Sequence, residues 1–312
     1  MMHMIVPSIM NLHGRYSRDR KPILTVDSGD TILARTRCCG WGFEPPPAID
    51  VIPSIIPRAE RADPENDEGL CLLGPIAVKG AKPGMTLEVD IEELRVGAYG
   101  LTVTGGEENQ RYDKLGLDAS FAWMPWRFDE AGEVARNARG LAVRIRPFLG
   151  SLGVAQDLPG YHSNLLARNV GGNIDCKELT PGSKLYLPIE VPEAQFSFGD
   201  GHAVQGDGEL CDSAIECPMD EVKLTLTIRN DVVTKWPLAY TPDAWITFGF
   251  AEDLNDAMFI ATNNMLDLMM SKHSMTRKEA VMLASLVVDL RITQIANPTV
   301  GVHAILPHGS FA

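Results

Sequence analysis

The chain has 312 residues, of which 45% are hydrophobic and 22% charged, an ordinary composition for a globular protein with a sizeable core. The formal net charge is -13 and the basic residues are scattered, which argues against nucleic acid or an anionic membrane as a partner and favours a small molecule. No stretch approaches the roughly 20 apolar residues that span a bilayer, and the N-terminus lacks the basic segment and cleavage site of a secretory signal, so we expect a cytoplasmic protein.

Strands separated by turns are predicted over the first two-thirds of the chain. Residues 22–38 contain two β-rich runs around a Ser-Gly-Asp turn, which is the pattern of a hairpin. The segments 74–97 and 176–192 use Lys-Pro-Gly and Thr-Pro-Gly-Ser turns in the same way. The run EVKLTLTIRN from Glu221 alternates for long enough to predict a further strand.

Two helices are predicted near the C-terminus, over about residues 253–290. The first carries an apolar stripe at helical spacing, made of Met258, Ala261, Met265, Leu268 and Met269. The second is predicted to begin at Thr276, because Glu279 follows three residues later at the spacing of a capping box. We interpret the Met-rich stripe as core packing, and Asp289 and Arg291 as forming ion pairs or hydrogen bonds around the end of the second helix.

These elements predict a β-dominated α+β fold, with antiparallel twisted sheets in a sandwich-like or barrel-like arrangement and a C-terminal helical hairpin packed on them. We expect one domain over residues 1–312, β-rich over 1–250. Strands and helices do not alternate as a parallel sheet requires. The glycine-rich run GDGHAVQGDGE lies between strands and lacks a phosphate-binding lysine, so nucleotide binding is not expected.

The stretch FGDGHAVQGDGE, residues 198–209, combines glycines with potential metal ligands. Glycine lets the backbone bend sharply, so the side chains of Asp200, His202, Asp207 and Glu209 could be aimed at one point. Carboxylate oxygens and an imidazole suit zinc or a similar divalent ion, and an open coordination position would allow metal-assisted hydrolysis. The alternative is a solvated acidic turn, since Asp and Gly are also common turn residues.

The six cysteines show no paired C-x-x-C spacing, so neither a zinc finger nor a disulfide framework is predicted. We interpret them as mostly buried free thiols in a reducing compartment. Cys176 follows Asp175 directly, and neighbours on a strand point to opposite sides. Cys176 is therefore predicted to point away from Asp175 as an inert buried thiol rather than to act as a nucleophile.

Four blocks of the sequence together resemble the acetamidase/formamidase family of amide hydrolases. They are GPIAVKGAKPG (74–84), the long run from GGNID to AIE (171–216), SLVVDLRIT (285–293) and GVHAILP (301–307). The resemblance implies hydrolysis of a short amide to a carboxylate and ammonia, a divalent metal in the site, and a homo-oligomer of two or more subunits. The stretches CCGWGFEPPPA (38–48) and FLGSLGVAQD (148–157) match the family less well and could line the pocket.

Roles can be assigned to these candidates as hypotheses. Asp175 and His202 are the first-choice metal ligands, because two glycines before Asn173 permit a tight approach and His is a common ligand of transition metals. Asp200 and Asp207 are further ligand candidates. Glu209 is the candidate base, and on an extended segment it would share a face with Asp207. His162 is either a residue lining the site or a loop histidine bonded to backbone.

The predicted function is metal-dependent cleavage of a short linear amide. The metal is predicted to be Zn²⁺, which lowers the pKa of bound water to about 7 and polarises a carbonyl. A cyclic amide, a γ-lactam, is the alternative substrate. The alternative from another class is a non-catalytic β-domain that holds Ca²⁺ in the acidic loop, but calcium prefers an all-oxygen shell and His202 argues against it.

Overall fold

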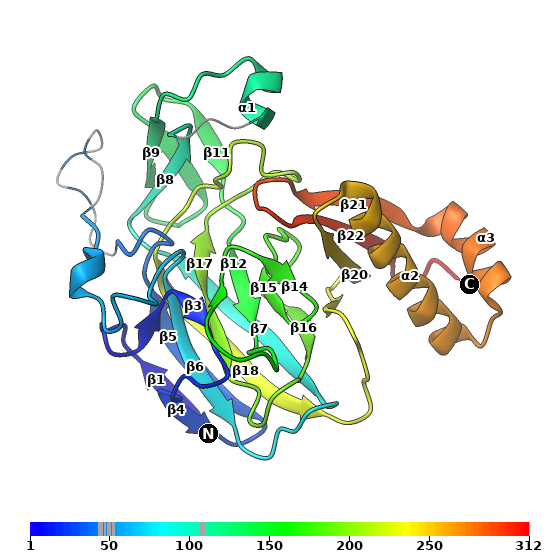
Figure 1. Cartoon of the computed structure of the whole chain (residues 1–312). Coiled ribbons are helices and arrows are strands. Elements are labelled where there is room, and N and C mark those ends of the chain that lie inside the picture. Colours follow the sequence, from blue (N-terminus) through cyan, green and yellow to red (C-terminus); the bar gives the residue numbers. More distant parts are fainter. Residues whose placement is uncertain (43–45, 47, 49–50, 52–53, 107–109, 312) are drawn as a thin grey trace.

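The computed structural model describes residues 1–42, 46, 48, 51, 54–106 and 110–311, and two large sheets make up most of it (Figure 1). The nine-stranded sheet has, in spatial order, Met2–Ile5 (β1), Asp30–Thr36 (β5), Met219–Arg229 (β18), Thr86–Val96 (β7), Ser183–Pro188 (β16), Leu238–Tyr240 (β19), Ala244–Ala251 (β20), Val300–Pro307 (β22) and Asp289–Gln294 (β21). The seven-stranded sheet has Ala167–Arg168 (β14), Gly171–Asn173 (β15), Phe148–Gly153 (β12), Phe196–His202 (β17), Leu72–Val78 (β6) and Leu12–His13 (β2), with Leu24–Val26 (β4) also paired to β6.

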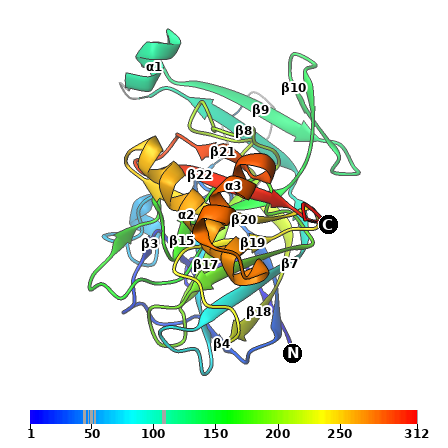
Figure 2. The ribbon, with the colours of Figure 1, turned by 90° about the vertical axis from the view of Figure 1, so that its right-hand side faces the viewer.

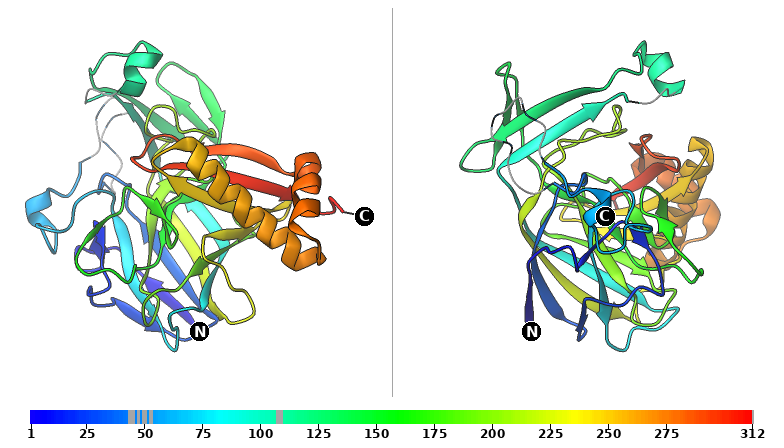
Figure 3. Two further views of the ribbon diagram at one scale, coloured as in Figure 1. Left: turned by 45° about the vertical axis from the view of Figure 1, so that its right-hand side comes forward. Right: turned by 60° about the vertical axis from the view of Figure 1, so that its left-hand side comes forward.

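Smaller elements lie outside the two large sheets. A four-stranded sheet stands apart at the upper end of the molecule, with the short helix α1 beside it (Figure 3). The four-stranded sheet has, in spatial order, Ala142–Arg144 (β11), Val134–Asn137 (β10), Ala122–Phe128 (β9) and Tyr99–Thr104 (β8). A separate two-stranded sheet consists of His162–Ser163 (β13) and Arg15–Tyr16 (β3). The helices are Arg58–Glu60 (η1), Gln110–Leu115 (α1), Leu254–His273 (α2) and Arg277–Val287 (α3).

The β-dominated α+β fold predicted from the sequence is confirmed. Among the strands of the described residues, the pairs are antiparallel except for β1 with β5 and β4 with β6. Within the described residues none of the sheets closes into a barrel, so the barrel-like alternative is not observed. One continuous apolar core contains residues of both large sheets, such as Leu152 and Phe198 of one and Ile91 and Leu224 of the other. No helix of the described chain has the length and hydropathy that crossing a membrane requires.

The helical hairpin forms a second, smaller core against the end of the nine-stranded sheet (Figure 2). The buried residues of α2 are Ala257, Ala261, Met265, Leu266 and Met269, so the predicted stripe is rotated slightly from its expected position. The start of α3 is as predicted, because the Thr276 side chain accepts from the Glu279 amide and the Glu279 carboxylate accepts from the Thr276 amide.

Two hairpins predicted from the sequence are not formed. β4 and β5 flank the Ser-Gly-Asp turn but join different sheets, and so do β6 and β7 on either side of Lys-Pro-Gly. Residues 289–294 form β21 directly after the end of α3, and the ion pair predicted for Arg291 is formed with Glu178. Alternation in a sequence reports a strand and its faces, whereas the partner strand is chosen by contacts far away along the chain.

We predict that Met265→Ala lowers the free energy of unfolding by about 2–5 kcal/mol, because a fully buried side chain leaves a cavity in the core beneath α2. Met282 on α3 is 62% exposed, and Met282→Ala is the matched control, with an expected change within about 0.5 kcal/mol. Denaturant unfolding of both variants measures the difference. An equal loss of unfolding free energy in the two variants would contradict the assignment of Met265 to the buried face of α2.

Candidate active site

Three neighbouring strands of the seven-stranded sheet, β15, β12 and β17, bring the candidate residues together near the centre of the molecule (Figure 1). Ser151 of β12 lies opposite Asn173 of β15 and Gly199 of β17. Asp175 follows the end of β15, while Asp200 and His202 lie two residues apart on β17. Segments separated by some 25 residues in the sequence therefore supply one cluster of side chains.

The cluster joins four carboxylates to one imidazole. Ligand atoms of Asp175, Asp200 and His202 lie within 4.8 Å of one another, and so do those of His202, Glu209 and Glu216. His202 Nε2 is 3.3 Å from Asp200 Oδ1 and 3.1 Å from Glu216 Oε2. The Phe148 ring meets the imidazole edge-on at a centroid distance of 4.9 Å and helps to hold its plane. Four of the residues proposed from the sequence therefore converge, with Glu216 added.

Three acidic residues of the cluster have left-handed backbone conformations. Their φ angles are 54° at Asp175, 59° at Asp200 and 47° at Glu209. Non-glycine residues seldom adopt this region, at a cost of roughly 1–3 kcal/mol each, and such residues concentrate at functional sites. Positive φ angles at Gly208 and Glu209 show that residues 206–209 are not extended, so the condition under which Asp207 and Glu209 would share a face is not met.

Several buried polar atoms of the cluster lack a hydrogen-bond partner within the described chain. Asp175 is 1% exposed, Asp200 3%, His202 1% and Glu209 7%. In the part of the chain that the structure describes, Asp175 Oδ1, His202 Nδ1 and Glu209 Oε2 have no hydrogen-bond partner. Buried polar atoms are normally paired, because an unpaired one costs about 1–3 kcal/mol or more when it is charged. A cation bound in either ligand group that contains His202 would compensate part of this cost.

The backbone at Gly150 approaches the ligand atoms so closely that the place a Cβ atom would fill lies directly among them. A Cβ atom at this position would lie 2.4 Å from Asp200 Oδ2, 2.6 Å from Asp175 Oδ1 and 2.8 Å from His202 Cε1. The Gly150 carbonyl also accepts from the amides of Ile174 and Asp175, at 2.9 and 3.1 Å. The glycine thus fixes the backbone before Asp175 and keeps space free among the donors. Gly150 lies in the FLGSLGVAQD stretch, for which a place in the pocket lining was one possibility.

The carboxylates raise one another's pKa, as expected of like charges in a buried site. Burial, followed by the Asp200 carboxylate, raises the pKa of Asp175 well above its ordinary value. Burial, followed by the Asp175 carboxylate, does the same for the pKa of Glu209. Burial alone would lower the pKa of His202, but Glu216 and Asp200 raise it well above the usual value. The cluster therefore favours bound cations or protons.

Contacts around the cluster hold two of its members. Asn297, in the β21–β22 connection, donates to Asp175 Oδ2 at 3.0 Å, and the Gln205 side chain donates to the Asp175 carbonyl at 2.9 Å. Glu216 Oε1 accepts from the Ala214 amide at 2.8 Å. Burial would raise the pKa of Glu216, but the His202 charge and these hydrogen bonds lower it, so Glu216 is the carboxylate most firmly held in its charged form.

Sequence reasoning missed Glu216. A usable signal was present, because Glu216 is the one charged residue in the run Ala214–Cys217. A glutamate in such a run must be paired or bound if the run is buried. Cys39 also approaches the site, with its sulfur in one group with carboxylate oxygens of Asp200 and Glu216. Cys39 belongs to the stretch 38–48, for which a place in the pocket lining was one possibility. Residues 43–45 and 47 of that stretch lie outside the described residues.

Asp207 and His162 are not brought into the cluster. Asp207 Oδ2 pairs with Lys177 Nζ at 2.8 Å, because the left-handed backbone at Gly208 separates its direction from that of Glu209. His162 lies on the short strand β13, where its Nε2 atom is 3.3 Å from the Leu158 carbonyl oxygen. This contact agrees with the hypothesis that His162 is bonded to the backbone rather than lining the site. Neither residue belongs to a ligand group that contains Asp175 or His202 in the described chain.

A cavity of about 510 Å³ borders the cluster at Gln205 and Glu209. Its other walls are largely apolar and include Trp126 of β9, Val143 of β11 and Leu210. The four-stranded sheet thus supplies one side of the cavity and the loop after β17 supplies the other. A polar end with a carboxylate and an amide, opposite apolar walls, is typical of sites for small organic ligands.

Comparison with known proteins identifies relatives of this chain. The model of the Acetamidase/Formamidase family matches residues 160–312. An inferred formamidase of Schizosaccharomyces pombe is 25% identical over 322 aligned residues, covering 78% of this chain and 73% of that protein. A formamidase of Methylophilus methylotrophus is 51% identical over 43 residues, 14% of this chain and 11% of its own length. The crystal structure of an acetamidase from Bacillus halodurans superposes with a TM-score of 0.83 at 26% identity, covering 98% of this chain and 97% of that one. The resemblance predicted from the sequence blocks is confirmed.

We predict that Gly150→Ala weakens binding of a divalent metal ion roughly 10- to 100-fold, the scale of changes next to metal ligands, because the added methyl group would displace the carboxylates. Gly206→Ala is the matched control, since an added Cβ there meets no described atom within 4 Å. Titration calorimetry with zinc compares the two on folded protein. Equal affinities would show that the space beside Gly150 is not needed for an ion.

Proposed function

We propose that this chain, a relative of the acetamidase/formamidase family, is a metal-dependent amidase that cleaves a short linear amide of the formamide or acetamide type into a carboxylate and ammonia. The observation that carries the metal dependence is the buried cluster of four carboxylates around His202, with three donor atoms left unpaired within the described chain. The family relationship supports the reaction class. The metal and the substrate are our inference.

Asp175, Asp200 and His202 form the group that best fits a resident ion. Their donor atoms are two carboxylate oxygens and one imidazole nitrogen, all within 4.8 Å, and the space beside Gly150 opens onto them. Imidazole suits zinc, whereas calcium prefers oxygen donors, so the donor set argues for Zn²⁺ and against the calcium-binding alternative. When bound, such an ion acidifies water and polarises a carbonyl group.

Glu209 is the proposed proton carrier. It contacts the cavity, and burial next to Asp175 raises its pKa well above the ordinary value, which brings a carboxylate closer to the pH at which proton transfer is efficient. Its Oε2 atom has no partner among the described residues and is therefore available to a water molecule or substrate. Glu209 would take the proton of the attacking water and deliver it to the departing nitrogen.

Gln205 is placed to orient the amide. Its side-chain nitrogen donates to the Asp175 carbonyl, which fixes the oxygen end of the side chain. That oxygen is buried and, within the described chain, accepts no hydrogen bond, although the residue borders the cavity. A substrate NH₂ group could donate to it, and this bond would hold the nitrogen near Glu209. The apolar walls formed by Trp126 and Val143 would contact the acyl chain.

A larger or cyclic amide is the second candidate substrate. The cavity of about 510 Å³ has room for more than formamide, and its apolar walls would stabilise several carbon atoms of an acyl chain or a γ-lactam ring.

We also propose a cytoplasmic location, because all six cysteines lie in the described chain and are free thiols, as a reducing compartment would keep them. Assembly into a homo-oligomer of two or more subunits remains a proposal from the family resemblance.

Removal of metal is predicted to abolish amide hydrolysis. Chelated and dialysed protein should release no ammonia from formamide, acetamide, longer amides or a γ-lactam, and added zinc should restore the activity. Elemental analysis and ammonia release are measured on the same sample. Full turnover in protein that contains no metal would contradict the proposed mechanism.

Glu209→Gln is predicted to retain fold and metal while turnover falls by roughly 100-fold or more, the usual scale of acid-base catalysis. The glutamine keeps the shape of the side chain but cannot accept the proton. Glu252→Gln is the matched control and should keep its turnover, because Glu252 is exposed and is absent from the described residues that line the cavity. Loss of metal from Glu209→Gln would make Glu209 a ligand, and normal turnover would remove it from the reaction.

A further inference from the structure

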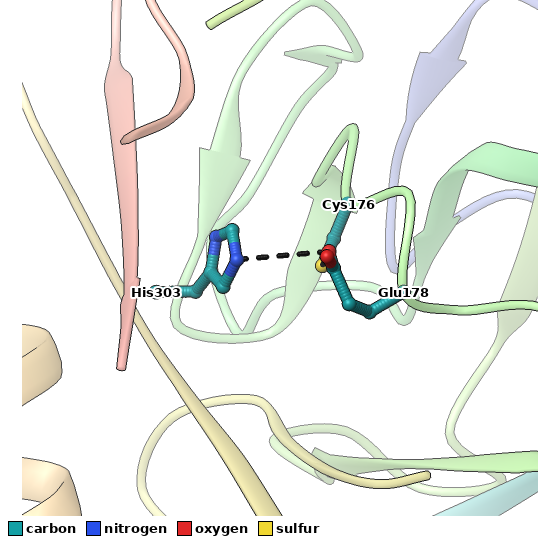
Figure 4. Close-up of side chains that lie close together, drawn as sticks. All are labelled: Cys176, Glu178 and His303. Carbon is teal, nitrogen blue, oxygen red and sulfur yellow. Dashed lines mark hydrogen bonds and ion pairs between the residues drawn. The ribbon is translucent and has the colours of Figure 1, made fainter. Parts of the chain in front are cut away.

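A second group of potential ligands begins at the residue that follows Asp175 in the sequence, and the amide-hydrolysis proposal does not use it. It consists of Cys176 and Glu178, in the segment between β15 and β16, and His303 on β22 (Figure 4). One donor atom from each residue lies within 4.8 Å of the other two. We propose that these three side chains form a separate site for zinc or another thiolate-binding divalent transition metal.

The spacing of the donor atoms suits one small ion. Cys176 Sγ is 3.3 Å from Glu178 Oε2, and His303 Nε2 is 3.6 Å from the same oxygen. Zinc bonds to nitrogen, oxygen and sulfur ligands are about 2.0–2.3 Å long, so tetrahedral ligands lie about 3.4 Å apart. The three side chains converge in Figure 4 with their donor atoms facing one another. Little movement is needed to place one ion between them.

The histidine supplies the observation that points to a ligand. His303 is 0% exposed, and its Nε2 atom has no hydrogen-bond partner among the residues that the structure describes. Its other nitrogen, Nδ1, lies 2.7 Å from Thr293 Oγ1. With Nδ1 donating to this hydroxyl, the lone pair of Nε2 faces Cys176 and Glu178. Metal-bound histidines are commonly oriented by such a bond on the nitrogen that does not bind the metal.

The Glu178 carboxylate is likewise oriented by a hydrogen bond to the oxygen that would not bind the ion, and the charges around the site are balanced. Arg291 donates to Glu178 Oε1 at 3.3 Å, which leaves Oε2 facing the other two donors. Asp207 pairs with Lys177 at 2.8 Å and lies 4.0 Å from Arg291. Two carboxylates thus offset two cations around the site. Ion binding would release the Cys176 thiol proton to solvent, and the thiolate then compensates part of the added charge.

A metal ligand explains Cys176 better than a nucleophile does. A nucleophilic thiol must reach its substrate, but Cys176 is 0% exposed and is absent from the described residues that line the cavity at Glu209. Burial and the Glu178 carboxylate also raise the pKa of this thiol well above its ordinary value. Direct coordination can stabilise a thiolate in such surroundings. The side chain of Glu178 is 12% exposed, so one member of the group reaches the surface.

Cobalt(II) replaces zinc in such sites and reports thiolate ligation by an intense near-ultraviolet charge-transfer band. Chelated full-length protein, titrated with Co²⁺, is expected to develop this band at one equivalent per chain. Cys176→Ser should lose the band, and zinc bound per chain should fall by one. Cys39→Ser is the critical control, since Cys39 lies near the acidic cluster, and this variant should keep the band.

Glu178→Gln, which keeps the shape of the side chain and the thiol, covers the case in which Cys176→Ser does not fold. It should weaken the affinity for Co²⁺ by at least tenfold while leaving the circular dichroism spectrum unchanged. Cobalt bound without a thiolate band in the unsubstituted chain would overturn the proposal, and so would a band that disappears with Cys39→Ser but persists in Cys176→Ser. The thiol would then be a hydrogen-bonded core residue.

Discussion

Four carboxylates buried beside one imidazole are the constraint on which the rest of the structure depends. Each of Asp175, Asp200, Glu209 and Glu216 is less than one-tenth exposed, and His202 can neutralise only one negative charge. Removing like charges from water and holding them together is unfavourable unless protons or a cation compensate. Burial, together with the neighbouring carboxylates, raises the pKa of Asp175, Asp200 and Glu209, which is one expression of this constraint. A resident divalent ion would be another response to the same constraint.

The surrounding fold tolerates local strain to maintain this arrangement. Left-handed backbone at Asp175, Asp200 and Glu209 turns their side chains inward, and the missing side chain of Gly150 leaves room for an ion. These conformations persist because the strands around them are held by long-range pairing, β12 between β15 and β17. The well-packed apolar core behind the strands, with Phe196 and Phe198 fully buried, supplies the stability that offsets the strain.

The sequence predicted the composition of the site better than its geometry. Asp200, His202 and Glu209 are close in the sequence among glycines, and Asp175 follows two more, so all four could be proposed. Asp207 could not be separated from Glu209, because the choice depends on the φ angles at Gly208 and Glu209. Glu216 reaches His202 through a bridge between separate segments. Likewise, alternation revealed β4 to β7 as strands, but their partners depend on contacts distant in sequence.

The most direct test of the account is calorimetric unfolding of metal-free Cys176→Ser protein with and without zinc, because this variant leaves the acidic cluster as the metal site under study. Zinc at 100 times its dissociation constant should stabilise the folded chain by about 2.7 kcal/mol and raise the unfolding temperature. Zinc should stabilise the double variant Cys176→Ser, Asp200→Asn by a smaller amount, because this protein lacks one of the carboxylate ligands. An unfolding temperature that is identical with and without zinc would contradict the claim that the cluster is built around a cation.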